Sequence, residues 1–258
     1  GYEHFMLKEI MEEPEALRRA ILPRIKDGAV VFDGLSLDSS RYDCIKIIAC
    51  GSSYHVGMVG KYNLEKLTRM PVEVILASEF RYCSPIVNDK TLAIVISQSG
   101  ETLDTMAALR EAKSLGARIL SIVNVVGSSI ARESDDVLYT WAGPEIAVAT
   151  TKAYSTQMAV LDLLAVWLAA KLGKLPAEEE NCLTTAIAAL PAQVEQILSN
   201  RERIQYYASQ YFNHDSVFFI GRNLDYALGM EGSLKLKEIS YIHSEAYASG
   251  ELKHGTIS

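Results

Sequence analysis

The sequence has few cysteines, and none of them is paired or clustered. Its 258 residues contain four cysteines, with no CxxC pair and no histidine at zinc-ligand spacing; they are Cys44, Cys50, Cys83 and Cys182. Neither a disulfide framework nor a zinc site is indicated, so no metal site is expected. Unpaired cysteines are typical of a reducing compartment, and we therefore expect a cytoplasmic protein.

An excess of positive charge is also missing, since the formal net charge is −7. This argues against nucleic acid or an anionic membrane surface as a partner, although a local pocket for one phosphate is compatible with it. The most apolar run, Met158 to Ala170, is interrupted by Asp162 and is shorter than the roughly 20 residues that cross a bilayer. No signal or transit segment is expected before it. The sequence therefore predicts no nucleic-acid partner and no membrane partner.

Short β-rich apolar runs alternate with helical stretches from Ile45 to Ala142. The runs are IKIIA, VEVILA, TLAIVI, ILSIV and DVLYTW. This alternation predicts an α/β fold, a three-layer α/β/α sandwich of the flavodoxin-like kind with a parallel sheet. Residues 151–172 are apolar on nearly every face, which predicts a long helix buried against the sheet or against a partner subunit.

The chain is predicted to have three parts. They are an N-terminal helical segment (residues 1–40), a first α/β domain (41–175), and connecting helices with a partial second unit of the same kind (176–258). The polar segment GKLPAEEEN, which contains Pro176, is the predicted connector.

Two helical stretches, 183–199 and 201–214, are predicted after that connector. SVFFIGR then predicts a strand, and a helix is predicted from about Asp225 to Ile242. A single strand cannot satisfy its own backbone hydrogen bonds, so the second unit is interpreted as cut off, or as leaning on the first domain or another chain. The chain as a whole is interpreted as a fragment.

The strongest local signal is LAIVISQSGETLDT, in which an apolar strand runs directly into a helix. The turn carries Ser97, Gln98, Ser99, Gly100 and Thr102. A helix N-terminus supplies unpaired amide donors and a partial positive charge, which suit a phosphate dianion, and glycine lets the backbone approach closely. No GxxxxGK sequence is present, so this is not a Walker loop. At this point both phosphate binding and simple helix capping by Ser99 remain open.

A second strand-to-helix turn, IIACGSSYHVG, places Cys50, Gly51, Ser52 and Ser53 at the carboxyl end of the first strand. Open α/β sheets bind their ligands at that end. Two turns rich in hydroxyl groups in one sheet therefore support each other. Cys50 has no evident base near it in the sequence, which favours packing over a nucleophilic role.

The segment MEGSLKLKEISYIH places Glu231, Lys235 and Glu238 on one face of a helix, at positions i, i+4 and i+7. Such spacing commonly means a surface ion pair, but a carboxylate beside an ammonium also suits proton abstraction next to a carbonyl. The segment GELKHG places His254 in a loop bounded by glycines. His254 is either a solvated side chain or an acid/base group that titrates near neutral pH.

Five segments together resemble the isomerase domain of the glutamine:fructose-6-phosphate aminotransferases, which is a sugar isomerase (SIS) domain. They are IIACGSSYHVGM, ASEFRY, SQSGETLDT, GPEIAVATTKAYSTQ and EGSLKLKEISYIHSEAYASGELKHG. The similarity runs from HFMLKEI, around Phe5, nearly to Ser258. SQSGET alone would indicate only the broader superfamily, whereas the order and spacing of all five are specific to the family. The resemblance implies hexosamine biosynthesis with a hexose 6-phosphate substrate and no cofactor.

The resemblance also implies roles for the substrate-binding residues. The two turns would hold the phosphate and the sugar hydroxyls, through Ser52, Ser53, Ser97, Gln98, Ser99 and Thr102. Val148 matches a backbone contact to the sugar, and Glu231 is similar to a supporting residue of the sugar site.

Three catalytic roles follow from the same resemblance. Glu238 would move a proton between C1 and C2 through an enediol-like intermediate, with Lys235 as its neighbour. His254 matches the histidine that opens the sugar ring, and it is expected to reach the site of the other subunit. The resemblance therefore implies a homodimer.

The chain departs from the family pattern in three ways. Ser52 replaces the usual threonine of a CGTS turn, which keeps a hydroxyl group. The family's glutaminase domain and the Schiff-base lysine near the family's C-terminus are both expected to lie outside this chain, which ends soon after HG. Complete synthase activity is therefore not expected of this chain.

Two other functions are less well supported by the sequence. A sugar-phosphate-sensing SIS module without turnover remains an alternative, although Glu238 and His254 argue against it. An enzyme similar to glucosamine-6-phosphate deaminases has no support from local motifs.

Overall fold

A parallel five-stranded sheet lies at the centre of residues 1–257, the part of the chain that this computed structural model describes. Its strand order is β4-β3-β5-β6-β7. The strands are β3 (Cys44–Ala49), β4 (Val72–Leu76), β5 (Thr91–Ser97), β6 (Arg118–Val123) and β7 (Asp136–Tyr139). Each predicted apolar run is therefore a strand, and the predicted parallel α/β architecture is confirmed.

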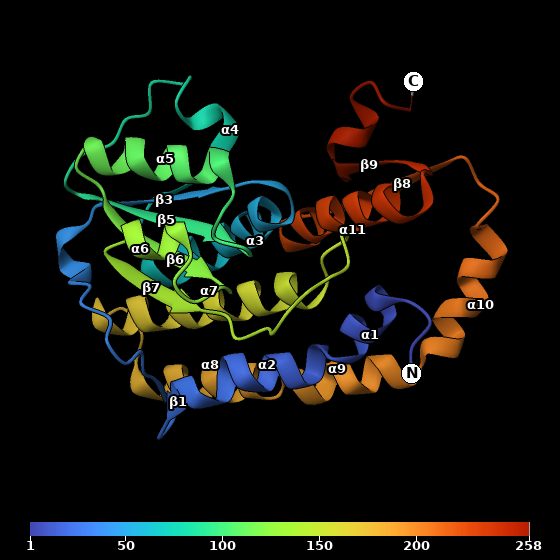
Figure 1. The fold of residues 1–258 in the computed structure, drawn as a ribbon, viewed down its shortest axis with the longest axis horizontal. Helices are drawn as coiled ribbons and strands as arrows, with labels where there is room; N and C mark the ends of the chain where they lie inside the picture. The colour runs from blue at the N-terminus through green and yellow to red at the C-terminus, as the bar shows by residue number, and fades with distance from the viewer. Residues whose placement is uncertain (258) are drawn as a thin grey trace.

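Helices cover both faces of this sheet (Figure 1). Side chains alternate along each strand, so Ile47 packs into the core on one face and Ile48 into the core on the other. On the first face lie α3 (Gly51–Thr68) and α7 (Lys152–Lys171). On the second lie α4 (Ala77–Phe80), α5 (Leu103–Ser114) and α6 (Ser129–Glu133).

The α7 helix is the long apolar helix that the sequence predicts. By length and composition alone it could cross a membrane, but 72% of its most apolar 18-residue window is buried inside the fold. It packs against α3, where Gly60 lets the two helices approach, since a Cβ atom there would lie 2.1 Å from Leu161 Cδ2. Its apolar character is therefore that of a core helix.

A further layer of helices lies on the outer side of α7 (Figure 1). It contains α1 (Phe5–Met11), α2 (Glu13–Ile21), α8 (Ala177–Ala188) and α9 (Leu190–Ser199). Between α2 and the sheet the chain forms two short 3-10 helices, η1 (Leu22–Arg24) and η2 (Ser39–Arg41). A hairpin of β1 (Ile25–Lys26) and β2 (Ala29–Val30) lies between them. The first 40 residues are thus not wholly helical.

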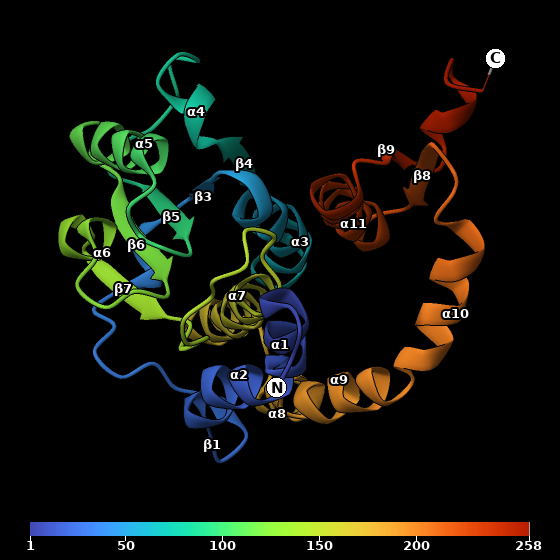
Figure 2. The same cartoon turned by 45° about the vertical axis from the view of Figure 1, so that its right-hand side comes forward.

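The connecting region also differs from its prediction. Helix α8 already begins at Ala177, so the end of GKLPAEEEN is its first turn rather than a connector. Pro191 lies in the first turn of α9, where proline lacks the amide that a continuing helix needs, and the predicted 183–199 helix is therefore two helices. α10 (Arg201–Tyr211) follows and leads towards the second unit (Figure 2).

The second unit consists of β8 (Ser216–Gly221), α11 (Leu224–Ser240), β9 (His243–Ala248) and η3 (Glu251–Lys253). The prediction that only one strand would be visible is wrong, because β8 and β9 pair in parallel with Ser216 opposite His243. HSEAYA carries too many polar residues to indicate a strand. Helix α11 packs against this small sheet and against α3 (Figure 2), so the second unit leans on the first domain.

Candidate functional site

The sheet has one point at which its topology creates a crevice. Strands β3 and β5 are neighbours, but the helices that follow them, α3 and α5, lie on opposite faces. Between two such crossovers the carboxyl ends of the strands are left open, and ligands of open α/β sheets bind there. Both turns rich in hydroxyl groups start at these two strand ends.

The SQSGET turn is held in one conformation by its own side chains. Ser97 Oγ lies 3.1 Å from Thr102 Oγ1 and accepts a hydrogen bond from the Gly100 amide at 3.0 Å. Gly100 has φ +67°, and a Cβ atom there would lie 2.1 Å from Ser128 Oγ, so only glycine fits. The turn is therefore prearranged, with its hydroxyl groups close together.

Ser99 does not cap the helix, which was the plainer interpretation of this residue. Thr102 occupies the N-cap position of α5, and Ser99 Oγ instead accepts a hydrogen bond from the Glu101 amide at 3.2 Å. The first amides of α5 have no acceptor within the helix. An anion at this turn would meet those amides together with three hydroxyl groups.

The second turn connects β3 to two other elements. Ser53 Oγ donates to Gln157 Oε1 on α7 at 3.0 Å, and Ser52 Oγ donates to Glu231 Oε1 on α11 at 2.8 Å. Cys50 Sγ accepts a weak bond from Thr105 Oγ1 at 3.7 Å. The turn is thus a junction between the first domain and α11.

The three charged residues predicted on α11 face this junction. Lys235 Nζ donates to Ser52 Oγ at 3.2 Å and lies 3.3 Å from Glu231 Oε1. It also forms an ion pair with Glu238. The Glu231 side chain is 7% exposed and that of Glu238 is 31% exposed, so Glu238 is the carboxylate that a ligand can reach.

These elements enclose a cavity of about 300 Å³. It is lined by Cys50, Ser52, Ser53, Gln98, Glu145, Ala147, Val148, Thr150, Gln157, Lys235 and Glu238. Seven of these were predicted site residues, drawn from segments as far apart as the second turn and α11. Ser97, Ser99 and Thr102 lie in the adjoining turn, and Glu231 lies behind Ser52 and Lys235.

Sequence reasoning missed Glu145 and Gln157. Glu145 accepts hydrogen bonds from the Thr151 amide at 2.8 Å and from Thr150 Oγ1 at 2.6 Å, which satisfies donors at the start of α7. It thereby fixes the loop that carries Val148, whose side chain is 97% exposed. Both residues lie in GPEIAVATTKAYSTQ, so that motif was the signal that could have found them.

Two predicted residues are placed apart from this cavity. Gly51 lines a neighbouring cavity between α3 and α11. His254 ends η3, where its amide donates to the Glu251 carbonyl at 2.9 Å, and it is not among the residues that line either cavity. Its role therefore stays a prediction. Within residues 1–257 there is no cluster of three or more metal-ligating side chains, and all four cysteines are free.

Carboxylates of the N-terminal segment hold the loop before α7 and the first turn of α7 itself. Buried Glu9 accepts a hydrogen bond from the Ile146 amide at 2.5 Å, and Lys152 donates to Glu12 at 2.7 Å. Glu13 accepts from Ser155 Oγ at 3.2 Å. Burial raises the pKa of Glu13 from its ordinary 4.5 to about 7, and the nearby Glu145 carboxylate adds to that rise.

Comparison with known proteins defines the class to which this fold and site belong. The SIS domain family model matches residues 41–167 and 210–258. These segments make up well over half of the chain, and the chain belongs to the SIS domain family.

Within that family, the chain is similar to isomerizing aminotransferases. The chain is 56% identical, over its whole length, to the glutamine–fructose-6-phosphate aminotransferase [isomerizing] of Caldanaerobacter subterraneus subsp. tengcongensis. It spans 43% of the length of that relative. The C-terminal domain of the glucosamine-fructose-6-phosphate aminotransferase of Francisella tularensis has a TM-score of 0.95 and 42% identity, over 99% of this chain and 72% of that one. The chain therefore corresponds to the isomerase portion of such enzymes.

A more distant structure shares only the fold. The glucosamine-6-phosphate deaminase of Thermotoga maritima has a TM-score of 0.73 and 24% identity, over 98% of this chain and 72% of that one. At that identity the similarity supports the SIS architecture but not a shared reaction.

The Glu13 carboxyl predicts a pH dependence of stability. Because its pKa is raised in the folded chain, its contribution to stability is fully present below about pH 4.5 and is lost as the pH rises through about 7. We expect Glu13→Gln to be about 1–2 kcal/mol more stable than the wild type at pH 8 and nearly equal to it at pH 5, a gain smaller than the full shift because Glu13 is only partly buried. Urea unfolding at both pH values measures this, with exposed Glu179→Gln as control. Equal stability of Glu13→Gln and wild type at pH 8 would contradict it.

Proposed function

We propose that this chain is the isomerase portion of a glutamine–fructose-6-phosphate aminotransferase and that its cavity binds fructose 6-phosphate. One observation carries the proposal. Two turns at the switch point of the sheet, and the Lys235–Glu238 pair from a helix more than 130 residues later, surround a single cavity. The choice of sugar comes from the name of the relatives, and the cavity has groups that suit the two ends of that sugar.

The phosphate end of the sugar is proposed to lie at the SQSGET turn. Ser97, Ser99 and Thr102 offer hydroxyl donors there, and the first amides of α5 add donors and a partial positive charge. The turn needs no lysine or arginine for this, because oriented amides and hydroxyls hold phosphate without a full positive charge.

The reacting end is proposed to lie at Glu238. Its carboxylate takes a proton from C1 of the open-chain ketose while the carbonyl oxygen at C2 becomes an enediolate oxygen. The C1 hydroxyl then passes its proton to that oxygen, and the Glu238 carboxyl, whose proton exchanges with solvent, protonates C2 and leaves the aldehyde at C1. Lys235 lies beside Glu238 and keeps the carboxylate directed into the cavity. An ammonium in that place also stabilises negative charge that develops on the enediol oxygens.

The remaining parts of the proposal come from the relatives rather than from this cavity. His254 is proposed to open the sugar ring from the partner subunit of a homodimer. Formation of glucosamine 6-phosphate and glutamate, in the cytoplasm, is proposed for the whole enzyme of which this chain corresponds to a part.

The phosphate assignment predicts weaker binding when one hydroxyl is removed. Ser99→Ala and Thr102→Ala should each lower the affinity for fructose 6-phosphate roughly tenfold, because each removes one hydrogen bond to a charged group. Titration calorimetry measures the affinity, and Ser114→Ala, an exposed serine at the far end of the same helix, is the control. If both variants bind as tightly as the control, the assignment of the phosphate to this turn is wrong.

The catalytic assignment predicts that the chain exchanges a sugar proton with solvent, and that loss of the Glu238 carboxylate slows this exchange without changing sugar binding. Incubation of the chain with fructose 6-phosphate in heavy water should place deuterium at C1 or C2. Glu238→Gln should slow that exchange by at least about 100-fold and spare binding, since shape is kept and the base is lost. Nuclear magnetic resonance of the sugar follows the exchange, with Glu179→Gln as control. Binding without exchange in the wild type would instead favour the sensing module, and exchange retained in Glu238→Gln would remove that residue from its role.

A further inference from the structure

His55 lies at the back of the candidate site. It lies on α3, close behind the CGSS turn, and its Nδ1 atom is 2.7 Å from Glu231 Oε2 on α11. Both side chains are largely buried, with 16% of His55 and 7% of Glu231 exposed. This contact joins two helices that lie more than 170 residues apart in the sequence.

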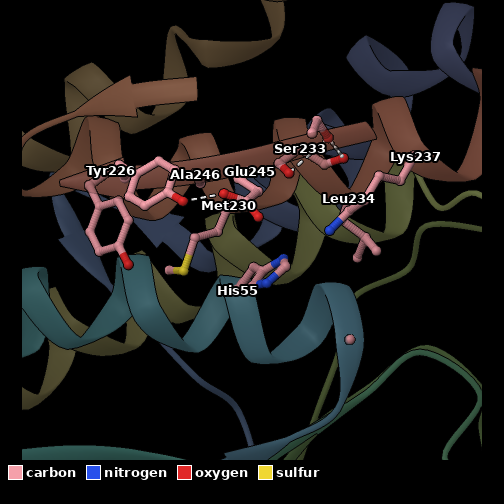
Figure 3. Close-up of a pocket in the computed structure, with 11 residues that line it drawn as sticks. His55, Tyr226, Met230, Ser233, Leu234, Lys237, Glu245 and Ala246 are labelled. Carbon is pink, nitrogen blue, oxygen red and sulfur yellow. Dashed lines mark hydrogen bonds between the residues drawn. The ribbon is translucent and has the colours of Figure 1, made fainter. Parts of the chain in front are cut away.

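Figure 3 shows the His55 ring between α3 and α11, in the neighbouring cavity of about 490 Å³. Met230 and Leu234 line the same cavity and offer the ring no strong hydrogen-bond partner, whereas Glu231 lies within hydrogen-bonding distance of Nδ1. The Tyr54 and His55 rings pack in a T-shaped arrangement, with the ring centroids 5.9 Å apart.

Glu231 has a partner on each of its oxygens. Oε2 faces His55, while Oε1 accepts from Ser52 Oγ and lies 3.3 Å from Lys235 Nζ. A buried carboxylate is costly unless it is paired on both sides, and loss of one partner leaves it free to turn. If it turned, Ser52 and Lys235 would lose the acceptor that holds them.

We propose that His55 is a positioning residue, which fixes Glu231 and through it holds Ser52 and directs Lys235 towards Glu238. The inference rests on the proposed function for its catalytic consequence. The network runs from His55 to Glu231, then to Lys235, and ends at Glu238 on the cavity wall. Side chains fixed in this way keep a catalytic pair in productive geometry.

The test compares three substitutions at one position. His55→Leu removes the hydrogen bond, His55→Asn places an amide nitrogen where Nδ1 lies, and His55→Gln carries its amide further out. His243→Leu, which removes an exposed histidine near Glu245, is the control. Circular dichroism first checks that each variant is folded.

Two readouts are measured for each variant. The first is the ¹⁵N-ammonium signal of Lys235, assigned by its absence in Lys235→Arg, which reports whether the ammonium is held in its hydrogen bonds and needs no activity. The second is the rate of deuterium exchange into fructose 6-phosphate, compared with the affinity for that sugar.

We expect His55→Leu and His55→Gln to lose the Lys235 signal and to slow exchange roughly tenfold, with a smaller change in affinity, and His55→Asn to restore both. A Lys235 signal retained in His55→Leu, or lost equally in His55→Asn, would overturn the inference. If His55→Leu does not fold, both readouts are compared between His55→Asn and His55→Gln, and equal values in these two variants would overturn the inference. Absence of exchange in the wild type would count against the proposed function, while the ammonium signal would still decide whether His55 positions Lys235.

Discussion

The opposite crossovers after β3 and β5 determine where this chain can bind a ligand. Because α3 and α5 leave neighbouring strands on opposite faces, their N-termini diverge and leave the strand ends uncovered. Both turns at this edge carry hydroxyl groups, and α5 adds its unpaired amides. The position of the cavity is thus a consequence of strand order, and the identity of its donors is a consequence of two short motifs.

A second constraint brings α11 to that edge. Glu231 is a buried carboxylate, and its partners come from α3 and from its own helix. Ion pairs of this kind contribute little to net stability, but they specify which side chains meet. The contacts of Glu231 therefore align the second unit with the first, and this alignment places Lys235 and Glu238 opposite the two turns. Glu9 on the N-terminal helix α1 has a comparable effect on the loop of Val148, and Glu145 within that loop adds to it.

The sequence predicted those elements of the structure that depend on local residue patterns. The five strands, the buried helix α7 and the two polar turns follow from apolar periodicity and turn chemistry, and the structure contains them all. Strand β9 was missed because its residues are mostly polar and its pairing with β8 is visible only after folding. Glu145, Gln157 and His55 were missed because each acts through a residue distant in sequence, or through backbone amides. The roles of the predicted site residues remain predictions, although most of those residues line one cavity or lie next to it.

The central claim is that the two turns at the switch point hold the charged end of a hexose phosphate. Crystals of this chain soaked in glucose 6-phosphate test it most directly. The account predicts density for the phosphate within hydrogen-bonding distance of Ser97, Ser99 and Thr102, with the sugar extending towards Glu238. Empty turns, with the sugar bound elsewhere on the molecule, would contradict it.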